Sequence, residues 1–281
     1  MKYKIIADSS CDLTEELKQK LDIELIPFVI DVDEVKYTDD ENFVLREFID
    51  HMNSSPNPIK TACASPGLYA ERFSEYKDTS DGIFVITISS KLSGSYNSAE
   101  VGKQMYLERY PDKKIHIIDS LSASAGETLL ALKLKELIDS GLNFEEVVEE
   151  IEKFKSTQNT MFSLESLDNL IKNGRITKTK GLIANVLSIK PVMKAVSGEI
   201  EVYEMARGVH KSLKEMAAGI GVLNEDVKGR TLVIAHVQDE RKAEYVKEEA
   251  EKLYDFKEII IVPTAGLSSG YAADKGIVIS F

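Results

Sequence analysis

Serine hydroxyls gather in the loops that follow the short apolar segments of this sequence. The segment Ser90–Ser98 alone holds four serines. Hydroxyls in loops that lead into helices can hold an anion, because unpaired backbone N–H groups and the helix dipole point the same way. For any single serine the alternative is N-capping or turn formation. One cap does not need four serines, so we predict an anion site that includes Ser93. Comparable loops contain Ser9, Ser10, Ser120, Ser268 and Ser269.

Nucleophilic catalysis is the alternative chemistry for such a serine. A nucleophile elbow has the pattern Gly-x-Ser-x-Gly between a strand and a helix, which Ser93–Asn97 does not match. His236 ends a predicted strand, where it could reach a cleft and act as a base. An acyl-ester hydrolase or phosphotransferase that uses Ser93 and His236 therefore stays open. The sequence contains no P-loop and no Gly-x-Gly-x-x-Gly motif after a strand.

Composition excludes several classes of protein. The 35 basic and 47 acidic residues give a net charge of −12, which disfavours nucleic acid and anionic membranes as partners. The two cysteines, Cys11 and Cys63, lack the clustered spacing of a zinc site, and nothing else assigns a metal or cofactor. No apolar run approaches the ~20 residues of a membrane span, and the N-terminus lacks a signal-peptide core. We expect a soluble, cytoplasmic protein.

Two α/β domains are predicted, residues 1–158 and 159–281. In the first, apolar segments alternate with helical ones, which indicates a mostly parallel sheet flanked by helices. Its predicted strands are Tyr3–Ala7, Ile23–Ile30 (weakened by Pro27), Ile83–Ile88 and Ile115–Ile118. The first strand leads to a helix that Asp12 and Glu15 would open as a capping box. The second, smaller domain has a hairpin signal at Ser197-Gly198 within a predicted mixed sheet.

One basic island interrupts the acidic chain. It spans Lys172–Lys180 and contains Arg175. Together with Arg207 and Lys211, this arginine could dock a partner protein or contact a phosphate. The alternative is an ordinary solvated helix end and loop, and the sequence does not decide between the two.

Several motifs resemble the DegV family of fatty-acid-binding proteins, in the family's order and over essentially the whole chain. The most specific motif is the run from Ile88 to Ala99, Ile-Ser-Ser-Lys-Leu-Ser-Gly-Ser-Tyr-Asn-Ser-Ala. The weaker, collinear ones are Asp8–Leu13, Thr61–Pro66, Asp119-Ser120, Leu167–Ile176 and Lys190-Pro191. By this resemblance the chain is expected to have two α/β domains with a ligand between them.

The resemblance implies that a long-chain fatty acid such as palmitate lies in a buried tunnel, with its carboxylate held by Thr61 and Ser93. It implies a lipid-binding protein of lipid transport or fatty acid metabolism rather than an enzyme, and some members present the acid to a fatty acid kinase. The family's usual His-Thr-Gly-Pro-Gly is replaced here by Ser268–Ala272. Ser268 or Ser269 is therefore expected to replace the histidine contact.

Overall fold

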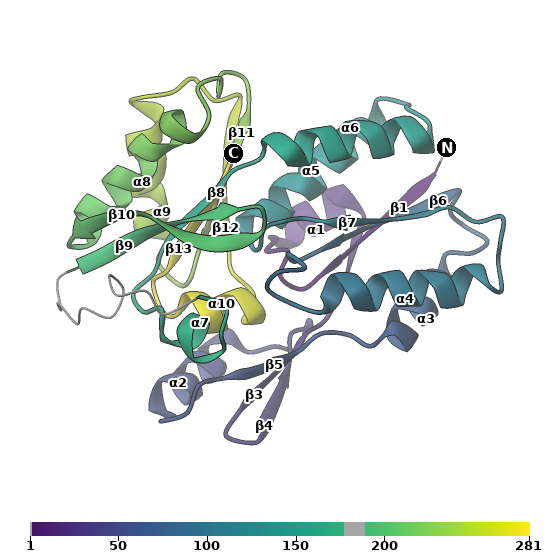
Figure 1. Cartoon of the computed structure of the whole chain (residues 1–281), viewed down its shortest axis with the longest axis horizontal. Coiled ribbons are helices and arrows are strands. Elements are labelled where there is room, and N and C mark those ends of the chain that lie inside the picture. Colours follow the sequence, from purple (N-terminus) through teal and green to yellow (C-terminus); the bar gives the residue numbers. More distant parts are fainter. Residues whose placement is uncertain (1, 177–188) are drawn as a thin grey trace.

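The computed structural model describes residues 2–176 and 189–281, and within these ranges the strands form three sheets (Figure 1). The first sheet is entirely parallel, in the order β2-β1-β6-β7. Its strands are β1 (Tyr3–Asp8), β2 (Ile23–Ile26), β6 (Gly82–Thr87) and β7 (Ile115–Asp119). Every residue of β6 is buried, as expected of a parallel strand that is covered on both faces. The predicted parallel sheet is confirmed.

Helices cover both faces of this sheet. Ile83 and Val85 of β6 pack against α3 (Pro66–Glu75) and α4 (Ser95–Leu107), whereas Phe84 and Ile86 face α5 (Ala125–Asp139) and α6 (Phe144–Thr157). Side-chain caps start two of these helices. Ser65 accepts from the Leu68 N–H at α3, and Asn143 forms a capping box at α6.

The second sheet is mixed and has the order β10-β9-β8-β13-β11-β12, with only β11 and β12 parallel. Its strands are β8 (Thr160–Ser163), β9 (Ile189–Val196), β10 (Glu199–Arg207), β11 (Thr231–His236), β12 (Glu258–Pro263) and β13 (Ile277–Ser280). Helices α8 (Val209–Leu223) and α9 (Glu240–Glu251) pack against it. The predicted hairpin is β9–β10, whose turn residues Ser197 and Gly198 have φ of 50° and 85°. This sheet confirms the mixed C-terminal architecture.

A small third sheet corrects one predicted strand. The segment Ile23–Ile30 does not form a single strand, because β2 ends at Ile26 and the chain then joins another sheet. Pro27 at the break has no N–H to donate to a ladder. The third sheet is antiparallel, with strands β3 (Val29–Val32), β4 (Val35–Thr38) and β5 (Lys60–Ala62), and α2 (Leu45–Ser54) lies beside it (Figure 1). It places Thr61 beside the larger sheets.

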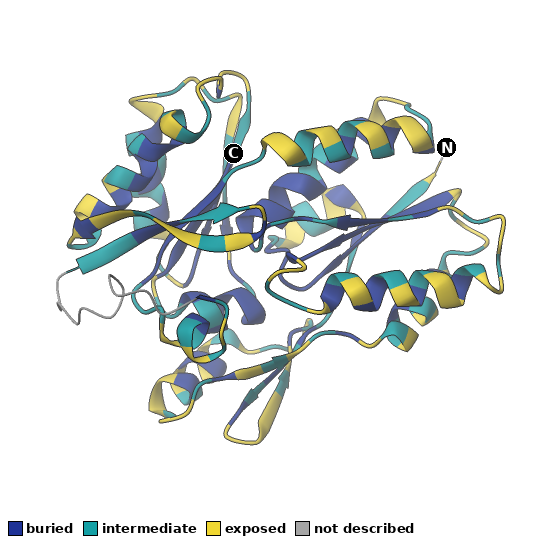
Figure 2. Cartoon of the chain, viewed as in Figure 1, coloured by how far each residue is buried: buried dark blue, intermediate teal, exposed yellow. Residues whose placement is uncertain are grey.

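Helix α5 lies between the two large sheets. It contacts β1 and β6 of the first and β11 and β13 of the second, and it is buried from Ala125 to Ala131 (Figure 2). A helix that is covered on all sides is normally apolar throughout, yet α5 carries Glu127 at an exposed fraction of 0%. The predicted boundary at residue 158 falls between α6 and β8, and the division of the chain at that point stays a prediction.

Two buried carboxylates hold α10 (Gly266–Ala272), a helix that the sequence did not predict. Asp39 accepts hydrogen bonds from the backbone N–H groups of Gly266 and Leu267 at 2.7 and 2.9 Å, and from the Ser9 hydroxyl at 2.8 Å. Asp12 accepts from the Ala265 N–H at 2.7 Å. Three successive amides before and within the first turn of α10 are therefore satisfied by the chain's own carboxylates.

The position of Asp12 corrects a second prediction. Thr14, not Asp12, caps α1 (Glu15–Leu21), since the Thr14 hydroxyl accepts from the Leu17 N–H. The Asp12 side chain turns inward instead and accepts from the Ser124 hydroxyl at 2.5 Å. Burial raises the pKa of Asp12 to about 7, although its hydrogen bonds act in the opposite direction.

Asp8 and Glu127 form a second pair of buried acids behind the first sheet's loops. Asp8 accepts from the Ser95 hydroxyl at 2.6 Å and from the Ile88 N–H at 3.0 Å, and burial raises its pKa to about 6. Burial raises the pKa of Glu127 further, and the charge of Asp8 adds to the shift. Neither Glu127 oxygen has a well-oriented hydrogen-bond partner among the described residues. Glu127 is thus the member of the pair that holds its proton more tightly.

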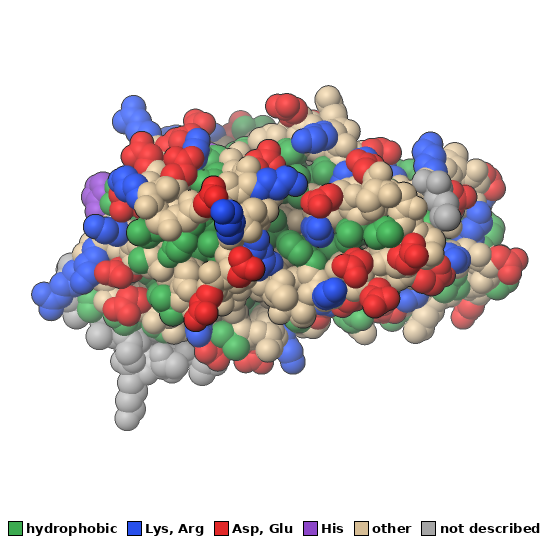
Figure 3. Space-filling view, turned by 90° about the horizontal axis from the view of Figure 1, so that it is seen from above, with side chains coloured by type: hydrophobic (Ala, Val, Ile, Leu, Met, Phe, Trp, Pro, Cys, Tyr) green, Lys and Arg blue, Asp and Glu red, His purple; other side chains and the backbone are tan. Residues whose placement is uncertain are grey.

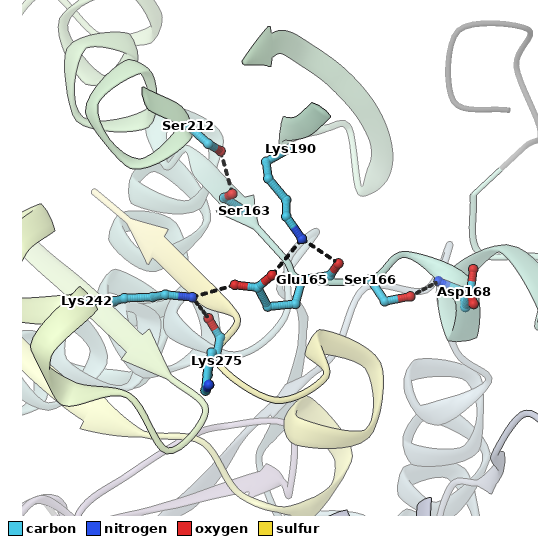
Figure 4. A network of polar contacts seen from close by, with 8 residues as sticks. All are labelled: Ser163, Glu165, Ser166, Asp168, Lys190, Ser212, Lys242 and Lys275. Carbon is cyan, nitrogen blue, oxygen red and sulfur yellow. Dashed lines mark hydrogen bonds and ion pairs between the residues drawn. The ribbon is translucent and has the colours of Figure 1, made fainter. Parts of the chain in front are cut away.

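An ion-pair network joins elements of the second sheet (Figure 4). Glu165, just after β8, contacts Lys190 on β9 and Lys242 on α9, both at 2.6 Å. Lys242 also donates to the carbonyl of Lys275 at 3.1 Å. The network ties the segment that leads from β8 into α7 (Asp168–Lys172) to the neighbouring strand and helix.

We predict that Asp12→Asn reduces the pH dependence of stability. Because the pKa of Asp12 is higher in the folded than in the unfolded chain, the folded protein binds more protons between about pH 4 and 7. This group's contribution to the free energy of unfolding therefore falls as pH rises through that range, by on the order of 4 kcal/mol in total. Urea unfolding at a series of pH values should give a flatter profile for Asp12→Asn than for the wild type.

Asp112→Asn, which changes an exposed carboxyl, is the matched control and should keep the wild-type profile. Parallel profiles for Asp12→Asn and the wild type would show that Asp12 titrates alike in the folded and unfolded chain.

Candidate functional site

A cavity lies where loops of the first sheet meet β8, β9, β10, β13, α7 and α10. Most of its wall is apolar, and several hydroxyls and one cation complete it. The apolar side chains are Phe28, Ile88, Leu92, Leu121, Ala123, Phe162, Leu164, Leu170, Ala195, Ile200, Leu267, Ala272 and Val278. The polar ones are Ser10, Thr61, Ser93, Ser122, Ser124, Thr160, Arg175, Ser268 and Tyr271. An apolar enclosure with a few polar groups is typical of a small-molecule site.

Thr61 and Ser93, the two predicted binding residues, both line this cavity. Thr61 on β5 shares a hydrogen bond of 3.0 Å with the hydroxyl of Tyr271 on α10. Ser93 lies in the loop between β6 and α4, where its oxygen accepts from the Ser95 N–H at 3.2 Å. The Cys63 thiol lies beside Ser93, and burial raises the pKa of that thiol. The hydroxyls of Thr61 and Ser93 thus both belong to the cavity wall.

The structure separates Ser268 from Ser269. Ser268 lines the cavity, whereas the Ser269 hydroxyl is buried against Thr264 at 2.7 Å and does not. Of the two, only Ser268 is placed to contact a ligand. Tyr271, one turn further along α10, also lines the cavity and was missed by the sequence analysis.

Arg175 lies in the cavity wall rather than on an open surface. It donates to the carbonyl oxygens of Leu92 at 3.0 Å and Asn173 at 2.6 Å, and its guanidinium lies 6.0 Å from the centre of the Tyr271 ring. Arg207, at the end of β10, and Lys211, on α8, are exposed and lie away from the cavity. Residues 177–180 of the predicted basic island lie outside the described residues.

Ser93 and His236 are not brought together. His236 ends β11, lines no part of the cavity, and has a buried Nδ1 without a hydrogen-bond partner in the described part of the chain. Burial lowers the pKa of this histidine. No histidine is among the residues that line the cavity, so the geometry supplies no general base for Ser93 among the described residues.

Neither a metal site nor a membrane-spanning helix is found in residues 2–176 and 189–281. These residues contain no group of three or more His, Cys, Asp or Glu side chains that could hold a metal ion. In the same ranges, every helix is too short or too polar to cross a membrane.

Comparison with known proteins places the chain among relatives that match it end to end. A DegV domain-containing protein of Streptococcus pneumoniae is 37% identical over 284 residues, covering 100% of this chain and 99% of the relative. A DegV family protein from Ruminococcus gnavus, solved with vaccenic acid, has a TM-score of 0.94, 39% identity and 99% coverage of both chains. The fatty acid kinase (Fak) B3 protein of S. pneumoniae, loaded with linoleic acid, has a TM-score of 0.88 and 35% identity, covering 100% of this chain and 99% of its own.

The fold of these neighbours agrees with the parallel and mixed sheets described above. The model of a family described as uncharacterised DegV proteins matches residues 2–278. From the nearly complete family match and the identity of its relatives, the chain belongs to the DegV family.

Proposed function

We propose that this protein binds a long-chain fatty acid such as palmitate in the cavity, with the carboxylate facing Thr61 and Ser93 and the acyl chain among the apolar side chains. The observation that carries the proposal is one cavity that joins an extended apolar wall to clustered hydroxyls. Relatives that cover the whole chain support it, since they were solved with vaccenic and linoleic acid. Arg175 is placed to add a further polar contact to the head group, and Ser268 lines the same cavity.

The energetics suit a carrier. Burying about fifteen methylenes yields on the order of 12 kcal/mol before costs, at ~0.8 kcal/mol each. Association and ordering of the chain offset a large part of this gain. The tail therefore supplies most of the affinity, and the hydroxyls need only orient the head group and keep it hydrogen-bonded.

A protein that binds a fatty acid in this way can carry it to other proteins. We infer that it acts in the cytoplasm, in lipid transport or fatty acid metabolism, and that it presents the bound acid to a fatty acid kinase. The S. pneumoniae relative, named as a fatty acid kinase B3 protein, supports this role. In this proposal the chain holds the substrate and contributes no catalytic residue of its own.

Ser93→Ala and Thr61→Ala should each weaken fatty acid binding by about ten- to a hundredfold, because one hydrogen bond to a charged head group contributes roughly 1.5–3 kcal/mol. The purified wild-type protein should release a long-chain fatty acid on denaturation, detected by mass spectrometry. Titration with a fluorescent fatty acid would give the affinities.

His236→Ala is the control for these variants, since this side chain does not line the cavity. Wild-type protein that neither carries nor takes up a fatty acid would refute the proposal. Lost function in His236→Ala with unchanged lipid binding would favour the hydrolase alternative.

Docking of the kinase needs a local surface, since a net charge of −12 gives no general attraction to another acidic protein. On the face seen in Figure 3, acidic and basic side chains are interspersed rather than gathered by sign. We propose that Arg207 and Lys211, which are exposed at the β10–α8 connection, contribute to docking. Arg175 is better assigned to the head group, because it lies in the cavity wall.

Arg207→Glu should slow acyl phosphate formation by added kinase and leave the binding of free fatty acid unchanged, because a charge at the rim of an interface acts mainly on the association rate. Lys257→Glu is the matched control, as it reverses an exposed charge beside β12, at the opposite edge of the six-stranded sheet. Equal effects of the two reversals on the kinase reaction would remove Arg207 from the docking surface. Loss of lipid binding in Arg207→Glu would place it in the ligand site instead.

A further inference from the structure

Among the hydroxyls that line the cavity, two groups differ in where their protons go. Thr61 and Tyr271 share one hydrogen bond, so one of their two protons remains for a ligand. Ser93 accepts from the Ser95 N–H, and the group beside its own proton is the Cys63 thiol, a weak acceptor that leaves this proton available to a ligand. With Arg175 beside Tyr271, this side of the cavity offers hydrogen-bond donors.

The hydroxyls of Ser124 and Ser268, with Ser10 beside both of them, instead present acceptor oxygens to the cavity. The Ser124 hydroxyl donates to the Asp12 carboxylate at 2.5 Å. Ser268 donates to the Ser10 carbonyl at a long 3.5 Å and lies close enough to Asp12 to lower its pKa. The Ser10 oxygen accepts from the Ser124 N–H at 3.3 Å, and the same hydroxyl lowers the pKa of Glu127. Because the protons of Ser124 and Ser268 point toward an acid and a carbonyl, their oxygens offer the cavity lone pairs.

Acidic groups surround this second set of hydroxyls on the side away from the cavity. Asp8 and Glu127 lie behind Ser10, Asp12 lies behind Ser124 and Ser268, and Asp39 adds its negative field to Asp12. The buried Cys11 thiol adds no positive charge, and burial raises its pKa. Among the described residues that line the cavity, Arg175 is the one cation. A carboxylate placed against this wall would meet lone pairs and like charge, whereas an O–H group would find acceptors.

We propose that Ser124 and Ser268, with Ser10 beside both of them, form an acceptor subsite that binds an O–H donor of the ligand. The donor is either the proton of a fatty acid bound in its neutral form or a hydroxyl on the acyl chain. The inference deepens the proposed function and rests on it, because it assumes that a fatty acid occupies the cavity. It assigns the donor side, at Thr61 and Ser93, to the carbonyl oxygen of the same ligand.

The first arm of the test follows the ligand's own carboxyl group. Palmitic acid labelled with ¹³C at the carboxyl carbon is bound to the full-length protein, and its chemical shift is recorded against pH. If the neutral acid binds, the carboxyl should titrate about one pH unit or more above its value in Ser124→Gly. Glycine is chosen because Ser124 has a φ of 56°, which an alanine would adopt at a cost.

The second arm tests a chain hydroxyl. Stearic acid is compared with stearic acids that carry a hydroxyl on the second, third or twelfth carbon. If a chain hydroxyl is the donor, one of these acids should bind about tenfold more tightly than stearic acid, and Ser124→Gly should abolish that gain. Ser122→Gly is the matched control, because its hydroxyl also lines the cavity but bonds to Thr160 at 2.7 Å rather than to an acid.

Ser268→Ala supplies a second variant on a separate element, should Ser124→Gly fold poorly. The subsite is supported if Ser124→Gly or Ser268→Ala, but not Ser122→Gly, removes one of the two effects. Loss of the raised pKa of the bound carboxyl identifies the neutral acid as the donor, and loss of the tighter binding of a hydroxylated acid identifies the chain hydroxyl. The subsite is overturned if the bound carboxyl has the same pKa in the wild type and in Ser124→Gly and no hydroxylated acid binds more tightly than stearic acid. It is also overturned if Ser122→Gly loses either effect to the same extent as Ser124→Gly. Fatty acid binding without a donor preference refutes this subsite alone, whereas no binding of any fatty acid refutes the proposed function as well.

Discussion

Four acids are buried in this protein without an ion-pair partner among the described residues: Asp8, Asp12, Asp39 and Glu127. An ionised carboxylate away from water costs several kcal/mol unless hydrogen bonds replace its hydration. The three aspartates meet this demand with backbone N–H groups and serine hydroxyls, whereas burial raises the pKa of Glu127 well above its usual range. The donors come from loops of different sheets, so satisfying the acids also holds those loops in place.

The need to hydrogen-bond the buried acids also positions part of the cavity wall. Asp39 and Asp12 bind the start of α10, and α10 carries both Ser268 and Tyr271 into the cavity wall. Tyr271 then meets Thr61, which arrives on the small third sheet. Two residues 210 positions apart are thus brought into contact by a helix whose first amides are already occupied. A ligand carboxylate cannot use those amides, so its hydrogen bonds must come from side chains elsewhere in the wall.

The sequence predicted those parts of the fold that depend on local patterns. Buried parallel strands such as Gly82–Thr87 follow from continuous apolar runs, and the cap at Ser65 and the turn at Ser197-Gly198 follow from residue types at fixed spacing. Where two residues could each cap the same helix, only tertiary contacts decided which of them does so. Asp12 looked like a helix cap, but Thr14 serves that role and Asp12 binds a backbone amide 253 residues away.

The site was less accessible to sequence reasoning than the fold. Thr61 came only from the resemblance to the DegV family, since its hydroxyl does not differ locally from a turn or cap residue, whereas Ser93 was also indicated by the cluster of serines around it. Arg175 stood out only as a charge in a basic island, because nothing local indicates that it turns back onto the Leu92 carbonyl. Tyr271 carried no signal at all, since α10 has few of the apolar positions that mark a helix.

A serine or threonine hydroxyl can either donate or accept a hydrogen bond, and the fold decides which of the two it does. Each can donate or accept, and a loop of serines gives no sign of which it will do. The Asp12 carboxylate takes the proton of Ser124 and the Ser10 carbonyl takes that of Ser268, so those oxygens are left to accept. The Ser93 proton lies beside the weakly accepting Cys63 thiol and stays available to a ligand. The acids buried behind the wall thus set how it treats charge and hydrogen-bond donors. Affinity for an acyl chain comes from apolar area, but the form of head group that the cavity tolerates is decided by residues that never touch the ligand.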